Sequence, residues 1–218
     1  MIGNDVVDLN DPEARPGATH PRFDGRVFAR SELALLRASG APNRLRWMLW
    51  AAKEAAYKVA KKIAPRTVFS PSRFVVKLDE TLSGKVTCDE GTLAVRVWEE
   101  ASTVHAVATG ESSPDTRILS GTETLEFYAG GDPEQQSDAV RSLAIARLSE
   151  NLKVPASDLS IEKRGRVPSV LRNGVDTGID LSLSHHGRVI GFACELGPMV
   201  EACDAQNTHD PLDEELHP

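Results

Sequence analysis

Apolar and polar positions along the chain follow two periods, and each period predicts a kind of element. Apolar residues recur at helical spacing in three segments, and the longest of these ends before Pro65. The predicted helices cover residues 31–39, 43–63 and 132–152. Segments rich in β-branched residues, bounded by Gly, Pro, Asn and Asp, predict strands. These segments cover residues 2–9, 73–78, 93–100, 103–110, 123–129, 158–163, 168–174 and 179–196.

The order of these elements repeats weakly along the chain. A helix, a proline-led turn and strands that end in glycine occur twice, with the turn and strands at residues 71–110 and 155–197. A polar stretch with "SSPDT" at its centre separates the two copies. We therefore predict a first half at residues 1–110, a linker at 111–121 and a second half at 122–198. The expected fold class is α+β, with two similar α/β subdomains that leave a ligand-binding cleft between them.

Composition places the chain among ordinary globular proteins, with 40% hydrophobic and 26% charged residues. It contains no run of about 18 apolar residues of the kind that crosses a membrane. The first residues, "MIGNDVVDLND", lack the basic region and apolar core of a signal peptide, which predicts a cytoplasmic protein. Cysteines at 88, 194 and 203 have no metal-ligand spacing, so free thiols are expected.

Charge is distributed unevenly. The net charge of −7 arises largely in residues 199–218, which hold six acidic residues and no Lys or Arg, and this composition predicts a disordered acidic tail. Seven arginines lie between residues 14 and 46 against only Asp24 and Glu32. Such a patch could meet an acidic protein, phosphates or nucleic acid, or its members could be scattered over solvated faces.

The stretch "WAAKEAAYK" places a carboxylate on an aromatic helix face. Trp47, Trp50, Glu54 and Lys58 follow the spacing i, i+3, i+7, i+11, which puts them along one side of the predicted helix. The tryptophans indicate that this side faces inward. An unpaired buried charge is costly, so Glu54 needs a partner, either Lys58 one turn later or a metal ion. The next lysines, Lys61 and Lys62, are expected to complement the helix dipole.

A second carboxylate, Asp5, stands on the first predicted strand. Together with Glu54 it would offer two oxygen ligands from separate elements, a set that suits Mg²⁺ completed by water and substrate phosphates. The alternative is an ordinary turn or cap residue. Asp8 lies three positions further, faces the other side of the strand and is expected to start the following loop.

Two segments of the second half could bind phosphate. In "SLSHHG", a hydroxyl, backbone N–H groups and an imidazole meet at a glycine turn, without the further ligands that a metal site requires. Upstream, "EKRGRVP" contributes a second basic cluster, which could equally be an ordinary charged turn.

Taken together, "GNDVVDL", "WAAKEAAYK" and "GRVPSV…LSLSHHG" resemble the 4′-phosphopantetheinyl transferases, and the resemblance extends from residue 2 to about residue 196. It implies transfer of 4′-phosphopantetheine from coenzyme A to a serine of an apo acyl or peptidyl carrier protein, with Mg²⁺ and release of adenosine 3′,5′-bisphosphate. Whether the carrier serves fatty acid, polyketide or peptide synthesis stays open.

The resemblance also implies roles for individual residues. Asp5 and Glu54 match the metal ligands, Glu54 or a metal-bound water matches the base, and Lys58 matches a contact to coenzyme A phosphates. Further matches to cofactor-binding positions are Arg166, Ser184 and His185, although Val167 is an extra residue in the turn before Pro168. Arg22 and Arg26 match a segment that touches the acidic carrier protein.

Two departures from the family pattern shape the expectation. Val7 stands where many two-domain members have a second acid, so the metal would rest on Asp5, Glu54, phosphates and water. The motifs also follow the order of a single small synthase subunit, which implies a fused pseudo-dimer with one competent site between its halves. Such a chain has less reason to oligomerise, so a monomer is expected. An inactive coenzyme A- or carrier-binding module is the alternative. Nucleic-acid binding lacks an accompanying motif, and no membrane partner is expected.

Overall fold

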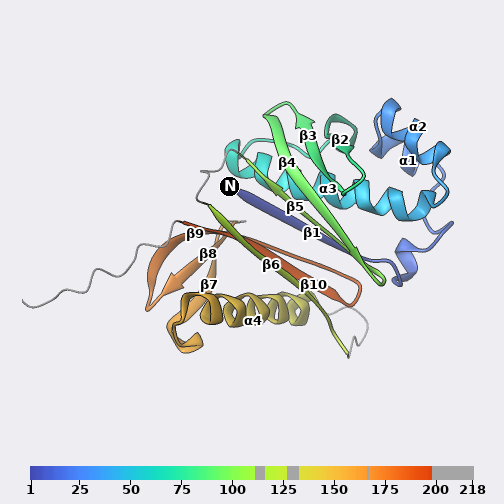
Figure 1. The fold of residues 1–218 in the computed structure, drawn as a ribbon. Helices are drawn as coiled ribbons and strands as arrows, with labels where there is room; N and C mark the ends of the chain where they lie inside the picture. Colours follow the sequence, from blue (N-terminus) through green and yellow to red (C-terminus); the bar gives the residue numbers. More distant parts are fainter. Residues whose placement is uncertain (111–115, 127–132, 166, 198–218) are drawn as a thin grey trace, which may run out of the picture.

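The computed structural model describes residues 1–110, 116–126, 133–165 and 167–197. They form two five-stranded antiparallel sheets, each covered by one long helix, and the sheets lie between the two helices (Figure 1). The first sheet has the order β1-β5-β4-β3-β2 and the second the order β6-β10-β9-β8-β7. The α+β class and the two similar subdomains predicted from the sequence are therefore confirmed.

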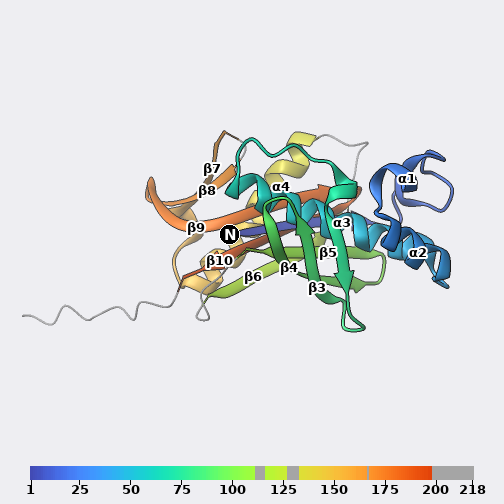
Figure 2. The same cartoon turned by 90° about the horizontal axis from the view of Figure 1, so that it is seen from above.

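The first half contains one strand, three helices and four further strands. Its helices are α1 (Phe23–Val27), α2 (Arg30–Ala38) and α3 (Pro42–Ile63). Its strands are β1 (Ile2–Asp8), β2 (Val75–Leu78), β3 (Ser83–Cys88), β4 (Gly91–Glu100) and β5 (Thr103–Thr109). Short 3₁₀ turns at Pro12–Ala14 and Pro71–Arg73 connect them. Viewed from above, α1 and α2 gather at one end of α3 (Figure 2).

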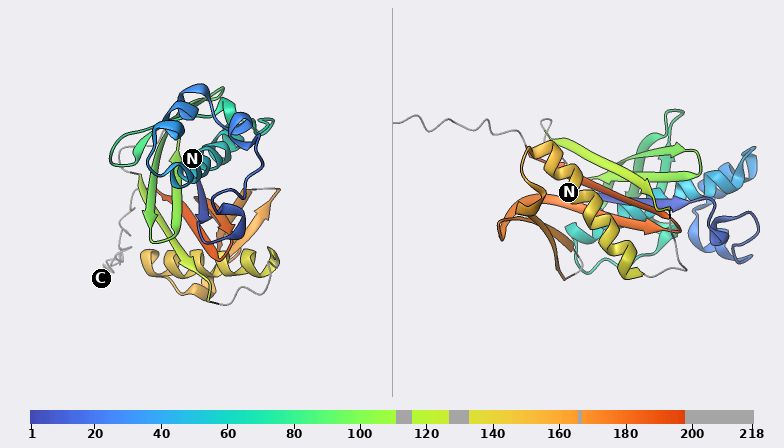
Figure 3. Two further views of the ribbon diagram at one scale, coloured as in Figure 1. Left: turned by 90° about the vertical axis from the view of Figure 1, so that its right-hand side faces the viewer. Right: turned by 90° about the horizontal axis from the view of Figure 1, so that it is seen from below.

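The second half repeats this plan. It consists of β6 (Arg117–Thr124), α4 (Pro133–Leu152), a 3₁₀ turn at Ala156–Asp158, β7 (Leu159–Arg164), β8 (Val167–Arg172), β9 (Val175–His186) and β10 (Val189–Leu196). Helix α4 lies across the outer face of the second sheet (Figure 3).

Matching hydrogen bonds define which positions of the two halves correspond. Leu9 N–H donates to the Ser102 carbonyl at 2.7 Å, and Leu125 N–H donates to the Arg188 carbonyl at 2.8 Å. In each half the donor comes directly after the first strand, and the acceptor comes directly before the last strand. The two strand pairs, β1–β5 and β6–β10, can therefore be aligned residue by residue from this bond. By this alignment Asp5, which pairs with Ala106, corresponds to Gly121, which pairs with Phe192.

Each half has its own hydrophobic core. In the first, small residues of α3 let the helix lie close to its sheet, and five of its alanines are fully buried: Ala51, Ala52, Ala55, Ala56 and Ala60. In the second, α4 packs Leu148 and its neighbours against Phe192 of β10. None of the described helices is long and apolar enough to span a membrane.

A fully buried ion pair ties α2 and α3 to the sheet. Lys53 Nζ donates to Glu32 Oε2 at 2.7 Å and to the Pro71 carbonyl at 3.1 Å. The other oxygen of Glu32 accepts the Val76 N–H at 2.7 Å. Both side chains have zero exposure, so the pair joins three elements inside the core.

The main departure from the predicted elements concerns the start of the second half. The strand expected at 123–129 is found at Arg117–Thr124, inside and beyond the segment expected as a linker. Its side facing α4 carries Leu119, Gly121 and Glu123, and its side facing the first half carries Ile118, Ser120 and Thr122, so neither side shows the apolar pattern that marks the other strands. Residues 111–115 of the expected linker and the whole expected tail at 199–218 lie outside the described ranges. Cys203 belongs to this tail and is therefore not described. Cys88 and Cys194 are free thiols, as predicted.

Candidate active site

The two halves meet where the outer edge of β1 lies on β9. The N–H groups of Ile2, Asn4 and Asp8 donate, in that order, to Asp180 Oδ2 at 2.7 Å, Ser182 Oγ at 2.9 Å and His186 Nδ1 at 3.1 Å. Because every second residue of β9 faces this edge, its side chains satisfy backbone groups that would otherwise lack a neighbouring strand.

Lys62 joins the halves at the end of α3. Its Nζ donates to the Ile2 carbonyl at 2.7 Å and the Leu181 carbonyl at 2.9 Å, and it forms an ion pair with Asp180. Its interpretation as a residue that only complements the helix dipole is therefore incomplete. Lys61 instead donates to the nearby Thr67 carbonyl at 2.8 Å.

Gly3 determines how close β1 lies to α3. A Cβ at this position would stand 2.1 Å from the Ala55 carbonyl oxygen and 3.1 Å from Lys58 Cβ. Only glycine permits this approach, which brings Asp5, two residues later on the same face, to the side of α3 that carries Glu54 and Lys58.

We expect Gly3→Ala to impair stability and activity together. The added Cβ must push β1 away from α3, which should cost about 1–3 kcal/mol of unfolding free energy. The resulting displacement of Asp5 should lower kcat of the transfer that the sequence resemblance implies at least about tenfold, because catalytic geometry tolerates little misplacement. Urea unfolding and a transfer assay measure the two effects. Gly110→Ala is the matched control, since its Cβ would meet Val59 only at 3.6 Å. Equal behaviour of the two variants would contradict a role for the close approach.

Asp5, Glu54 and Lys58 form a coupled group on α3 and β1. Lys58 Nζ donates to Asp5 Oδ1 at 3.1 Å and to the Asn4 carbonyl at 2.7 Å. Burial, followed by the nearby charge of Asp5, raises the pKa of Glu54 to about 7, while Lys58 opposes this shift. Burial also raises the pKa of Asp5 against the influence of Lys58. Two carboxylates held together with a shortage of positive charge are suited to a cation.

These donors fit a magnesium ion better than the other acidic cluster does. Asp11, Glu13 and His186 offer atoms within 4.8 Å of one another. However, His186 Nδ1 accepts the Asp8 N–H at 3.1 Å, so the lone pair of that nitrogen is already used and is not free for a metal. Asp5 and Glu54 provide carboxylate oxygens from two elements, the donor type that Mg²⁺ prefers.

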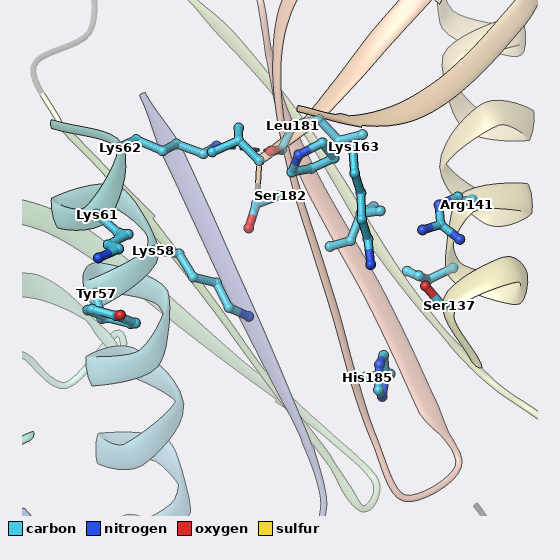
Figure 4. A pocket seen from close by; sticks show the side chains of 14 residues that line it. Tyr57, Lys58, Lys61, Lys62, Ser137, Arg141, Lys163, Leu181, Ser182 and His185 are labelled. Carbon is cyan, nitrogen blue, oxygen red and sulfur yellow. Dashed lines mark hydrogen bonds between the residues drawn. The ribbon is translucent and has the colours of Figure 1, made fainter. Parts of the chain in front are cut away.

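A cavity of about 300 Å³ opens beside this group, between α3 and the second half (Figure 4). Basic side chains from both halves line it: Lys58, Lys61 and Lys62 from α3, Arg141 from α4 and Lys163 from β7. His185 also lines it, and burial followed by the charge of Lys58 lowers the pKa of its imidazole. The concentration of positive charge suits a ligand with several phosphate groups.

The structure separates the two residues of the Ser-His pair. His185 faces the cavity, whereas Ser184 points to the interface between halves, where its Oγ accepts from Asn4 Nδ2 at 2.8 Å. Ser184 is buried at 6% exposure and does not line the cavity. Ser182 does line it, although its Oγ is already bonded to β1. Arg166 lies outside the described residues. Asp8 begins the following loop as predicted, because its Oδ1 accepts the Asn10 N–H at 2.9 Å.

Arg22 precedes α1 and Arg26 belongs to it, so both lie at the end of the molecule formed by α1 and α2 (Figures 1 and 2). Neither residue lines the cavity. Both side chains are exposed. Two other members of the arginine patch have acidic partners: Arg46 binds both oxygens of Asp24 at 2.7 and 2.8 Å, and Arg44 pairs with Glu99. The free charge of the patch is therefore smaller than the sequence suggests.

Comparison with known proteins identifies the family. The family model ACPS, described as the 4′-phosphopantetheinyl transferase superfamily, matches residues 1–109. The chain belongs to the 4′-phosphopantetheinyl transferase superfamily. No curated protein matches this superfamily member. Among solved structures it is similar to the holo-[acyl-carrier-protein] synthase (AcpS) of Thermotoga maritima, with a TM-score of 0.39 and 14% identity over 81% of this chain and 84% of that one.

The superfamily match includes Asp5, Glu54 and Lys58 but ends before His185. Phosphopantetheinyl transfer is thus the general chemistry of this superfamily member. Sequence reasoning found the three residues on β1 and α3, and it noted Lys163 only as part of a basic cluster. It missed Arg141, because a single arginine on a solvated helix face carries no signal of the cavity beside it.

Proposed function

We propose that this superfamily member transfers 4′-phosphopantetheine from coenzyme A to a serine of an apo acyl or peptidyl carrier protein in the cytoplasm, as a monomer and with Mg²⁺. One observation carries the proposal: Lys58, which pairs with Asp5 beside Glu54, lines a cavity together with four other basic side chains. The cavity suits the phosphates of coenzyme A, and the carboxylates suit a magnesium ion at the pyrophosphate.

The reaction follows from these positions. The serine oxygen of the carrier forms a bond to the phosphorus that bears the pantetheine group, and the bond from that phosphorus to the bridging oxygen breaks. Adenosine 3′,5′-bisphosphate leaves with the electron pair, and Glu54 receives the serine proton directly or through water. Its raised pKa of about 7 suits a proton acceptor near neutral pH. Mg²⁺, when bound by Asp5 and Glu54, supplies charge neutralisation for the pyrophosphate.

Basic side chains hold the leaving group. Lys58 reaches both Asp5 and the cavity, so it can contact a phosphate oxygen beside the carboxylates. Arg141 and Lys163 approach from the second half, which means that substrate binding uses both halves (Figure 4). The neutral imidazole of His185 offers a hydrogen bond rather than a further charge.

The test is a mass measurement on a panel of apo carrier proteins incubated with coenzyme A and Mg²⁺. A gain of one phosphopantetheine on a carrier, lost when EDTA is added, supports the proposal. Coenzyme A binding without a mass gain across the panel would instead favour the inactive binding module, which the valine at position 7 keeps open. The same panel identifies the carrier class.

We expect Arg22→Glu or Arg26→Glu to raise KM for the carrier protein about tenfold and to leave KM for coenzyme A within about twofold. Carrier proteins are acidic, so reversing an exposed charge weakens docking without touching the cavity. Steady-state kinetics with each substrate varied separately measures the difference. Arg172→Glu, at the exposed last residue of β8, is the control. An equal effect on both KM values would refute the docking role.

A further inference from the structure

A groove lies where the first half faces β6, at the position that corresponds to the β1–β9 contact. The hairpins β4–β5 and β9–β10 both close after a two-residue turn, with Glu100 opposite Thr103 and His186 opposite Val189. Residues of β4 and β5 therefore correspond directly to residues of β9 and β10. The outer edge of β6 should meet β4 in the way that β1 meets β9.

Different side chains prevent the same close contact. Trp98 occupies the position that corresponds to Ser184, and His105 occupies that of Gly191. Where β1 lies on β9, a Cβ at Gly191 would stand 2.4 Å from Val6 Cγ1, so only glycine allows β1 to lie this close. On the β6 side, Trp98 stacks on His105 with ring centroids 5.7 Å apart and fills the corresponding space.

The result is an elongated groove, called here the β6 groove. It consists of two adjoining cavities of about 320 and about 210 Å³, which share Trp98 and Ser120. The rest of the lining comes from β4, β5 and β6 and includes Ala94, Arg96, Glu100, Ile118 and Thr122. None of them lines the cavity beside Lys58, so a ligand in the β6 groove leaves that cavity accessible.

One wall of the β6 groove is an unprotected strand edge. Strand β6 is the last strand of its sheet, and its ladder to β10 uses the odd-numbered residues, as the Leu125 bond to Arg188 shows. The N–H groups of Ile118, Ser120 and Thr122 point the other way, and none has a hydrogen-bond partner among the described residues. Neither Pro nor Lys guards this edge, and the Ile118 side chain is 49% exposed. Such an edge is a template for another strand.

The opposite wall offers apolar and basic side chains. Trp98 is 37% exposed, and the Arg96 guanidinium lies 5.1 Å from its ring. The exposed Lys85 neighbours Ala94 in the groove and pairs across the sheet with the exposed Lys77. Glu100, at the far end, is the single acid among the described lining residues. A partner that fits this wall carries carboxylates and an apolar side chain.

We propose that the β6 groove binds an extended acidic segment of a partner protein, which adds to β6 as a further strand. Backbone hydrogen bonds to residues 118, 120 and 122 supply affinity, and Arg96, Lys85 and Trp98 select acidic and apolar side chains on the side facing β4. The site goes beyond the proposed transfer reaction and shares no residue with it.

The test uses a fluorescein-labelled twelve-residue peptide in which Glu alternates with Val, titrated by anisotropy into the full chain. Saturable binding is expected, and Arg96→Glu and Trp98→Ala should each weaken it at least about tenfold. Thr122→Pro should have a similar effect, because it removes an outward N–H while leaving the β10 ladder intact. Thr122→Val is the matched control and should bind within about twofold of the wild type. Unchanged phosphopantetheine transfer by all four variants verifies that they fold.

Two control peptides separate the contributions. Replacing Glu by Lys should abolish binding, and replacing alternate residues by Pro should abolish strand pairing. Binding that ignores Thr122→Pro or the charge of the peptide would overturn the proposal, as would no binding up to about 1 mM. Binding only after removal of residues 198–218 would assign the groove to the chain's own acidic segment and overturn a partner protein. Competition by a second copy, seen as concentration-dependent dimerisation through β6, would overturn it as well.

Discussion

Replacing Glu54 by glutamine is expected to abolish phosphopantetheine transfer, with a fall in kcat/KM of about 10³-fold or more. Glutamine preserves the size of the side chain but removes both the proton acceptor and one of the two carboxylates available to Mg²⁺. General base catalysis alone contributes about 10²–10⁴-fold, and the loss of a metal ligand adds to this. Initial rates on the apo carrier identified by the panel measure the effect.

Glu123→Gln is the matched control, because Glu123 is exposed on β6 and does not line the cavity. It should transfer at the wild-type rate. Near-normal turnover by Glu54→Gln would show that the base and the metal ligand have been misassigned. Residual activity that Mn²⁺ restores would point to a metal-binding role for Glu54 rather than a role as base.

The same variant should be more stable than the wild type at high pH in the absence of divalent cations. The pKa of Glu54 lies at about 7 in the folded chain, above its ordinary value of 4.5. The folded state therefore binds more protons than the unfolded state between these values, so stability falls as the pH rises through this window. A shift of this size corresponds to about 3 kcal/mol. Thermal unfolding at pH 5 and pH 8 should show a pH-dependent loss in the wild type that Glu54→Gln reduces.

Magnesium should reverse this loss. The ion binds the deprotonated carboxylates, so millimolar Mg²⁺ should raise Tm of the wild type more at pH 8 than at pH 5. Glu54→Gln should show a much smaller increase. An equal magnesium effect in both proteins would place the ion elsewhere.

Replacing Lys53 by methionine is expected to lower the unfolding free energy by about 3–5 kcal/mol. Methionine matches the volume of the lysine stem, but it leaves the carboxylate of Glu32 buried with only the Ala29 and Val76 N–H groups as donors. Removing one partner of a buried ion pair has a cost in this range, because the other charge stays uncompensated. Urea unfolding at pH 7 measures the change.

Two comparisons make this second result decisive. The double variant Lys53→Met with Glu32→Leu should recover part of the lost stability, since no charge is then buried alone. Arg73→Met breaks a mostly exposed ion pair with Asp89 and should cost less than about 1 kcal/mol. A cost for Lys53→Met as small as that of Arg73→Met would mean that the buried pair contributes little.

The sequence predicted those parts of the structure that local chemistry controls. The helical spacing of Glu54 and Lys58 correctly indicated that they share a helix face. The β-branched first segment correctly indicated a strand, and Asp5 of this strand lies beside both residues. Lys53, one residue from Glu54, gave no such signal, because its partner Glu32 belongs to another helix and a lysine in a helical pattern normally faces solvent. The close approach at Gly3 was equally hidden, since a glycine in a strand has several meanings.

The second half was harder to interpret for a related reason. In "SLSHHG" the alternation of a strand sends Ser184 and His185 to opposite faces, and only the position of β1 decides which face is the interface. Strand β6 was misplaced in the prediction because Leu119 is the one apolar residue on its side facing α4, so no alternating apolar pattern marks the strand. Both cases concern residues whose environment is created by the other half of the chain.

The presence of two similar halves in one chain also changes what a single substitution can do. In a symmetric dimer of identical subunits, one codon specifies a residue in both copies of an interface, so adaptation on one side is imposed on the other. Here Ser184 and Trp98 occupy corresponding positions but are encoded separately. The β1 side and the β6 side can therefore accumulate their own substitutions, and directed evolution could retarget the β6 side without a compensating change beside β1.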